Sequence, residues 1–107
     1  MPTYDLYGFP SSDLEAVRQQ VEAALAIRFE PHESSFIGEY YLYGKRYEKG
    51  NILLKMNYDP EDDDILYSEF ADFPVLLEAN DPDKPDGLRQ ELEAKLQGCK
   101  LLRRKQL

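Results

Sequence analysis

Apolar residues recur along this chain with two different periods, and the change between helix-type and strand-type spacing constrains the fold more than any other feature. Two stretches have the three- and four-residue spacing that places side chains on one face of a helix. Their apolar residues are Leu14, Val17, Val21, Ala24 and Leu25 in the first stretch and Leu88, Leu92 and Leu96 in the second. The spacing predicts a helix over residues 13–27, opened by a Ser12–Glu15 capping box, and a second helix capped by Asp86 and closed by Gly98.

The stretches around these two helices have the composition and spacing of strands. Residues 52–58 alternate most clearly, with Ile52, Leu54, Met56 and Tyr58 on one face. Residues 75–79 are short and almost continuously apolar, which is typical of a central strand covered on both faces. Further strands are expected over residues 3–9, 29–33, 36–43, 65–70 and 99–104, and residues 44–51 are expected to connect two strands of a hairpin.

This order of elements predicts an α+β fold in a single domain over residues 1–107. We expect a two-layer sandwich in which a mixed, mainly antiparallel sheet carries both helices on one face, as a ferredoxin-like variant with an inserted hairpin. Residues 75–104 read as strand, helix and strand, and we expect these two strands to be parallel neighbours joined by a right-handed crossover. A chain of 107 residues is long enough to bury one hydrophobic core.

The net charge of −8 is concentrated in one segment. Residues 58–86 contain eleven acidic residues and one Lys, whereas residues 87–107 contain two acidic and six basic residues. This balance argues against nucleic acid and against an anionic membrane surface as partners, because both attract clustered Lys and Arg. We therefore expect any partner to be basic. The chain has no apolar run of about 18 residues and no signal-peptide pattern, which predicts a cytoplasmic protein.

The acidic run over residues 59–64 has three possible interpretations. It can be a solvated loop that keeps the protein soluble and blocks edge pairing. It can be a calcium loop, but the sixth position, where an EF-hand has glycine, is Asp64, and no Glu stands at the twelfth position. It can also be a recognition surface for a cationic protein, since clustered acidic residues repel one another until a basic partner relieves them.

The residues that usually carry catalysis or hold cofactors do not form a recognisable pattern. The glycines stand singly, and no Gly-x-Ser-x-Gly, Cys-x-x-Cys or His-Glu-x-x-His motif is present. His32 lies among Glu and Ser residues, but neighbouring strand residues point to opposite faces, so we expect a surface histidine. The lone Cys99 cannot form an internal disulfide and is expected to be a buried structural thiol. We expect no enzymatic activity, no metal and no cofactor.

Four short segments resemble one known class of protein. They are residues 33–41 (ESSFIGEYY), 52–59 (ILLKMNYD), 73–77 (FPVLL) and 101–105 (LLRRK). Together they resemble small bacterial immunity proteins, which accompany the toxins of contact-dependent inhibition, polymorphic toxin and S-type pyocin systems. The resemblance implies a cytoplasmic protein that binds and blocks the C-terminal domain of a cognate toxin, often a nuclease.

The leading functional prediction is therefore a non-enzymatic, stoichiometric inhibitor of a basic toxin domain. The residues expected to bind the toxin are acidic residues for charge complementarity and two tyrosines as aromatic anchors. They are Tyr58, Asp59, Glu61, Asp62, Asp63, Asp64, Tyr67, Glu69 and Asp72. The alternative is a small acidic α+β binding module, or a homodimer that pairs through an exposed sheet edge. The sequence leaves the toxin's chemistry and the oligomeric state open.

Overall fold

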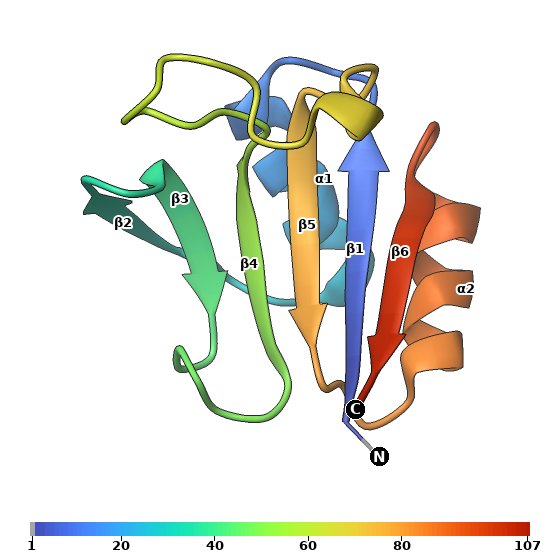
Figure 1. Cartoon of the computed structure of the whole chain (residues 1–107). Helices are drawn as coiled ribbons and strands as arrows, with labels where there is room; N and C mark the ends of the chain where they lie inside the picture. The colour runs from blue at the N-terminus through green and yellow to red at the C-terminus, as the bar shows by residue number, and fades with distance from the viewer. Residues whose placement is uncertain (1) are drawn as a thin grey trace.

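A computed structural model describes residues 2–107, in which six strands and two helices form an α+β fold (Figure 1). The strands are β1 (Thr3–Phe9), β2 (Glu30–Ser34), β3 (Gly38–Tyr43), β4 (Asn51–Met56), β5 (Val75–Asn80) and β6 (Lys100–Gln106). The helices are α1 (Leu14–Leu25) and α2 (Pro85–Lys95), and a short 3-10 helix, η1 (Ser68–Phe70), lies between β4 and β5. The two expected helices and the α+β class are confirmed.

The strands form one open sheet in the order β2-β3-β4-β5-β1-β6, and each neighbouring pair is antiparallel. The expectation that the strands on either side of α2 run parallel is confirmed, but the expectation that they are neighbours is wrong. Both β5 and β6 run antiparallel to β1, which lies between them, so these two strands are not paired with each other. The four strands β4, β5, β1 and β6 with the two helices form the expected ferredoxin-like arrangement, and the β2–β3 hairpin extends it at one edge.

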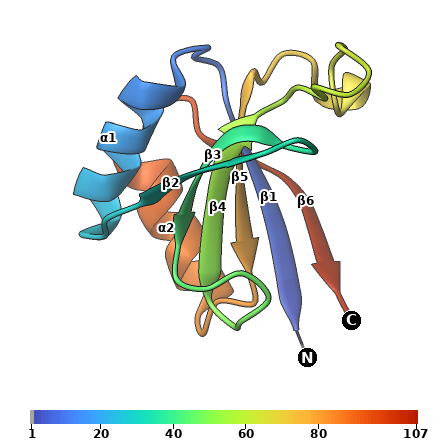
Figure 2. The same cartoon turned by 90° about the vertical axis from the view of Figure 1, so that its left-hand side faces the viewer.

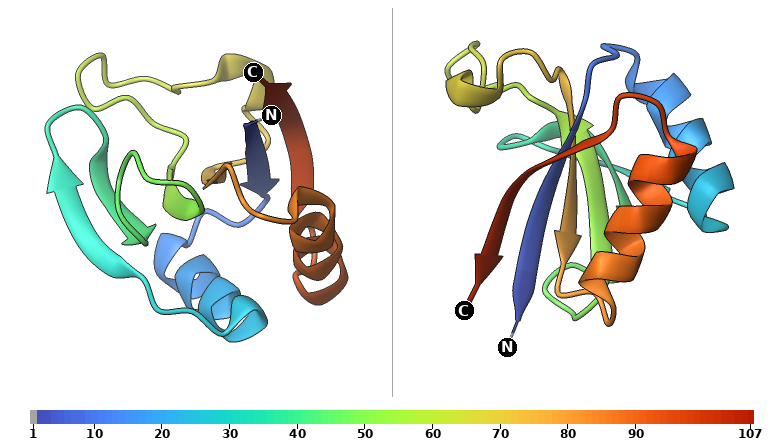
Figure 3. Two further views of the ribbon diagram at one scale, coloured as in Figure 1. Left: turned by 90° about the horizontal axis from the view of Figure 1, so that it is seen from below. Right: turned by 90° about the vertical axis from the view of Figure 1, so that its right-hand side faces the viewer.

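Both helices cover the same face of the sheet, as Figures 2 and 3 show. Val17 and Val21 of α1 and Leu92 of α2 are fully or almost fully buried, and they pack against the helix-facing side chains of the central strands. The sheet contributes Tyr7, Phe9, Ile52, Leu54, Val75, Leu77 and Ala79 to this core. The helical stripes and the alternation of residues 52–56 therefore meet in one apolar layer, as two-layer packing requires.

The opposite face of the sheet is also partly covered. Leu76 of β5, which points away from the helices, is as fully buried as its neighbours Val75 and Leu77. The segment between β4 and β5, including η1, lies on this side of the sheet (Figure 2). Gly8 makes this cover possible, because a Cβ atom there would lie 2.6 Å from the ring of Phe73. The prediction that residues 75–79 form a central strand covered on both faces is confirmed.

Three local expectations are wrong. The N-cap of α1 is Asp13, whose carboxylate accepts a hydrogen bond from the Ala16 amide at 3.1 Å, so Ser12 does not cap the helix. Helix α2 begins at Pro85, whose missing N–H costs nothing in a first turn, so Asp86 lies inside the helix and not at its cap. Residues 65–70 do not form a strand, since β3 and β5 already occupy both sides of β4, and η1 ends the segment instead.

A buried ion pair fixes β6 and α2 beside β1. The Asp5 carboxylate has no exposed surface and accepts hydrogen bonds from Arg104 Nε at 2.8 Å and Nη2 at 2.9 Å. The same guanidinium donates from Nη1 to Asp86 of α2 at 2.8 Å. This bidentate ion pair between Arg104 and Asp5 orients both side chains and is stronger than a single hydrogen bond.

Candidate interaction surface

The predicted acidic run forms a small hairpin, which we call the acidic hairpin (residues 59–64). The backbones of Asp59 and Asp64 pair across it, with N–H···O distances of 2.8 and 3.4 Å. Directly before Asp64, Asp63 has a positive φ of 51°, a conformation that Asp tolerates better than most residues. Figure 1 shows this segment beyond the ends of β4 and β5.

Three of the hairpin's own carboxylates shape it. Asp59 Oδ1 accepts hydrogen bonds from the amides of Glu61 at 2.9 Å and Asp62 at 3.4 Å, which is the local turn that Asp favours. Asp64 Oδ1 accepts from the next amide, Ile65 N, at 2.7 Å. The Tyr58 hydroxyl donates to the Asp63 carboxylate, and this hydrogen bond raises the pKa of Tyr58. The hairpin is therefore ordered by local hydrogen bonds.

The carboxylates of this region have no cationic partner within residues 2–107. The ion pairs of the described chain join other acidic residues, and none involves Asp59, the four acidic residues that follow Pro60, Glu69 or Asp72. Residues 61–64, Glu69 and Asp72 are exposed, and Asp59 is half-buried. These carboxylates therefore face solvent without an ion pair to the protein's own bases.

The two predicted aromatic anchors have different surroundings. Tyr58 is 40% exposed and adjoins the acidic hairpin in the chain. The half-buried Tyr67 lies against the open face of the sheet, where the Arg103 guanidinium is 5.3 Å from its ring centroid. Its ring also meets Phe70 edge-on, with the centroids 6.2 Å apart. Tyr67 therefore packs within its own loop and against β6, while Tyr58 stands at the hairpin.

Asn57 holds this region together, and sequence reasoning did not single it out. Its side chain is buried and makes three hydrogen bonds: Nδ2 donates to the carbonyls of Tyr67 at 3.2 Å and Phe70 at 3.1 Å, and Oδ1 accepts from the Tyr67 amide at 2.8 Å. Its backbone N–H donates to the Pro74 carbonyl at 2.7 Å. No signal in the sequence marked this role, because the alternation of residues 52–58 places Asn57 on the face where a polar side chain is expected to meet solvent.

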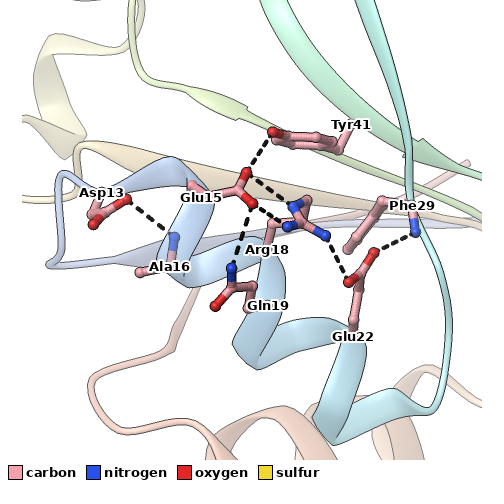
Figure 4. Close-up of polar contacts among 8 residues, drawn as sticks. All are labelled: Asp13, Glu15, Ala16, Arg18, Gln19, Glu22, Phe29 and Tyr41. Carbon is pink, nitrogen blue, oxygen red and sulfur yellow. Dashed lines mark hydrogen bonds and ion pairs between the residues drawn. The ribbon is translucent and has the colours of Figure 1, made fainter.

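A polar network anchors the neighbouring β2–β3 hairpin to α1 (Figure 4). Arg18 contacts the carboxylates of both Glu15 and Glu22, and its guanidinium lies 5.3 Å from the ring centroid of Tyr41. The Tyr41 hydroxyl donates to Glu15 at 2.7 Å, and the Phe29 amide donates to Glu22 at 2.8 Å. The hydrogen bonds from Arg18 and Tyr41 lower the pKa of Glu15 to about 2. The anchored hairpin in turn reaches the acidic hairpin, because an added Cβ at Gly38 would lie 4.0 Å from Pro60.

A concave region lies at the end of the sheet away from the acidic hairpin. Its volume is about 470 Å³, and its lining includes Tyr4, Arg46, Tyr47 and Lys49. Glu78, which also lines this region and is half-buried, forms an ion pair with the largely buried Lys55, with 2.6 Å between Oε2 and Nζ. Acidic and basic groups alternate here, so this cleft has no single charge preference.

The residues considered for catalysis lie on β2 and directly before β6. His32 is exposed and stacks on Tyr40, with ring centroids 5.4 Å apart. Cys99 is buried as expected, and burial raises the pKa of its thiol to about 12. Within residues 2–107, no group of three or more His, Cys, Asp or Glu side chains is arranged to hold a metal ion. None of the helices in the same range is long and apolar enough to cross a membrane.

Comparison of the chain with protein-family models, with curated proteins and with solved structures finds no match.

Proposed function

We propose that this chain is an immunity protein that binds the C-terminal domain of a cognate bacterial toxin in the cytoplasm and inhibits it by forming a stoichiometric complex. The observation that carries the proposal is the acidic hairpin, whose exposed carboxylates are held by local hydrogen bonds and have no cationic partner among residues 2–107. The resemblance of four sequence segments to immunity proteins supports the same function.

The charges of the two partners are complementary in this proposal. Carboxylates crowded into one short hairpin repel one another in the free protein, and a basic partner removes that repulsion on binding. A nuclease toxin carries basic surface because it must bind phosphates. The proposed binding residues are Tyr58, Asp59, Glu61, Asp62, Asp63, Asp64, Glu69 and Asp72. Tyr67, in contact with Arg103, supports the loop that carries them.

In this proposal the chain performs no chemistry. Inhibition requires only that it occupies the toxin's surface, either over the active site or beside it. We therefore expect His32→Ala and Cys99→Ser to protect against the toxin as well as the parent chain does.

Co-expression tests the proposal directly. The toxin domain encoded beside this chain's gene is expressed in a bacterial host, alone or with this chain. Protection of the host, together with a one-to-one complex in size-exclusion chromatography with light scattering, supports the proposal. Growth arrest that this chain does not relieve, with no complex formed, overturns it.

An alternative function rests on the open sheet. Among the described residues, strands β2 and β6 each pair on one side only, so their outer edges are free to join a strand of another chain. A small acidic binding module or an edge-paired homodimer is therefore the second candidate. A concentration-dependent dimer that forms no complex with the neighbouring gene's product would favour this alternative.

A further inference from the structure

An apolar pocket of about 450 Å³ directly adjoins the acidic hairpin. It is lined by Met56, Asn57, Tyr58, Ile65, Ala71 and Pro74. The chain leaves the pocket at Tyr58, forms the acidic hairpin over residues 59–64, and returns to the pocket at Ile65. The backbone pairing of Asp59 with Asp64 therefore brings the lining residues Tyr58 and Ile65 together at the base of the hairpin, so that pocket and carboxylates adjoin.

Hydrogen bonds and core packing hold the pocket walls in place. Asn57 is fixed by hydrogen bonds to Tyr67, Phe70 and Pro74, and Met56 packs against the main core. Tyr58 is fixed by its hydroxyl contact with Asp63. The free protein nevertheless leaves apolar surface open here, since Tyr58 is 40% exposed and Ile65 is 46% exposed. Well-formed concave apolar surface rimmed by charge is typical of a protein-binding site.

We propose that this pocket receives an apolar side chain of the basic partner, and that Lys or Arg residues flanking this side chain meet the carboxylates of the acidic hairpin. This inference rests on the proposed function and deepens it by stating the chemistry of the segment that binds. Charge complementarity selects the occupant, because an acidic or neutral apolar segment would gain nothing from the carboxylates at the rim. A second copy of this chain, with its net charge of −8, is disfavoured by repulsion.

The two parts of the surface contribute to different rate constants. Exposed charges act over a distance and raise the association rate. A buried apolar contact forms only in the docked complex, so its loss accelerates dissociation and leaves association nearly unchanged. This difference allows the pocket to be tested separately from the acidic hairpin.

The first experiment uses two synthetic peptides, Lys-Lys-Leu-Lys-Lys and Lys-Lys-Ser-Lys-Lys, which carry the same charge and differ only at the centre. Each is titrated into the protein while the methyl resonances of Ile65 and Ala71 are followed by NMR. We expect the leucine peptide to shift these methyl resonances in a saturable manner and the serine peptide to leave them nearly unchanged. Equal shifts with both peptides, or no shift with either, overturn the inference without involving the toxin.

The second experiment compares Ile65→Ala with its neighbour Leu66→Ala against the cognate toxin domain. Leu66 is 37% exposed but does not line the pocket, so it is a matched control. We expect Ile65→Ala to raise the dissociation rate about tenfold, and Leu66→Ala to change it by less than about twofold. Ala71→Leu, which fills the pocket from its rim, should also accelerate dissociation.

The outcomes separate the inference from the proposed function. If the toxin binds but Ile65→Ala, Ala71→Leu and Leu66→Ala all dissociate like the parent, the pocket inference fails and the immunity function stands. If the parent chain does not bind the toxin, both fail. If the parent is a dimer that Ile65→Ala converts to a monomer, a second copy occupies the pocket and the inference is overturned.

Discussion

At the scale of single residues, the buried hydroxyl of Tyr7 stands out in the core. Tyr7 has no exposed surface, and its Oη has no hydrogen-bond partner within residues 2–107. Burial and the nearby Asp5 carboxylate raise the pKa of this phenol, so it stays neutral. A buried polar group without a partner costs free energy, and this hydroxyl therefore weakens a core that its ring fills well.

Removing this hydroxyl should not destabilise the fold. We expect Tyr7→Phe to leave the free energy of unfolding unchanged or to raise it by about 1 kcal/mol, since the ring is kept and an unpaired group is removed. Urea denaturation followed by circular dichroism measures the difference. A clear loss of stability would mean that the hydroxyl has a bond to a buried water molecule.

Asn57 presents the opposite case, a buried polar side chain whose hydrogen bonds are well satisfied. We expect Asn57→Ala to lower the free energy of unfolding by about 1–3 kcal/mol, because it leaves two carbonyls and one amide unpaired. Hydrogen exchange of the Tyr67 amide should become faster than in the parent. Unchanged exchange at Tyr67 would show that this side chain does not hold the loop.

At the scale of elements, the helices were predictable and their ends were less so. The apolar stripe of α1 is a local pattern, and it places Val17 and Val21 in the core as expected. The N-cap of α1 depends on backbone angles that the sequence leaves open. Ser12 and Asp13 are adjacent and both have a side-chain oxygen that can accept the capping hydrogen bond. With Asp13 as the cap, Glu15 is the second helical residue and not the third, so it cannot complete a capping box and instead binds Arg18 one turn along the helix and Tyr41 of β3.

The Glu15 contacts should make stability depend on pH. Its pKa is lowered from 4.5 to about 2 in the folded chain, so the unfolded chain binds its proton first as the pH falls. The stabilisation is therefore fully present above pH 4.5 and is lost as the pH falls toward about 2. The urea midpoint of the parent should exceed that of Glu15→Gln at neutral pH, and the gap should close in acid. Glu91→Gln, on an exposed α2 position, is the control, and a gap that does not change with pH would contradict this assignment.

The position of α2 can be tested through its buried leucine. Leu92 has no exposed surface and lies in the core formed by both helices and the sheet. We expect Leu92→Asp to unfold the domain, because an unpaired carboxylate in that core costs several kcal/mol, on the order of the stability of a whole domain. Circular dichroism and a thermal melt measure this loss, and Glu91→Asp on the exposed side is the control. A cooperative melt of Leu92→Asp would mean that α2 is not packed in this way.

At the scale of the whole molecule, fold class was predictable and the neighbours of each strand were not. The alternating strands and two helical stripes indicate a two-layer α+β fold, but they do not say that β1 separates β5 from β6. The pairing of Asp5 with Arg104, nearly the full chain apart, joins β1 to β6, and its only trace in the sequence is an acidic residue inside an apolar strand. Likewise, the acidic run was visible in the sequence, whereas its hairpin and the adjoining pocket needed the packing of residues 65–74.

The measurement that tests the central claim most directly is the rate at which this protein associates with the cognate toxin domain. One variant neutralises the acidic hairpin (Glu61→Gln, Asp62→Asn, Asp63→Asn and Asp64→Asn). A control changes the net charge equally at distant exposed positions (Glu30→Gln, Glu48→Gln, Asp83→Asn and Glu91→Gln).

Surface plasmon resonance is run at 0.1 M and 1 M salt, where the Debye length is about 10 Å and about 3 Å. At the lower salt we expect the hairpin variant to associate about tenfold more slowly than the parent, and the control to lie much closer to the parent. The difference should shrink at 1 M salt, and the hairpin variant should be as stable to heat as the parent or slightly more so. If the parent and the hairpin variant associate at equal rates at both salt concentrations, the acidic hairpin is not part of the interface.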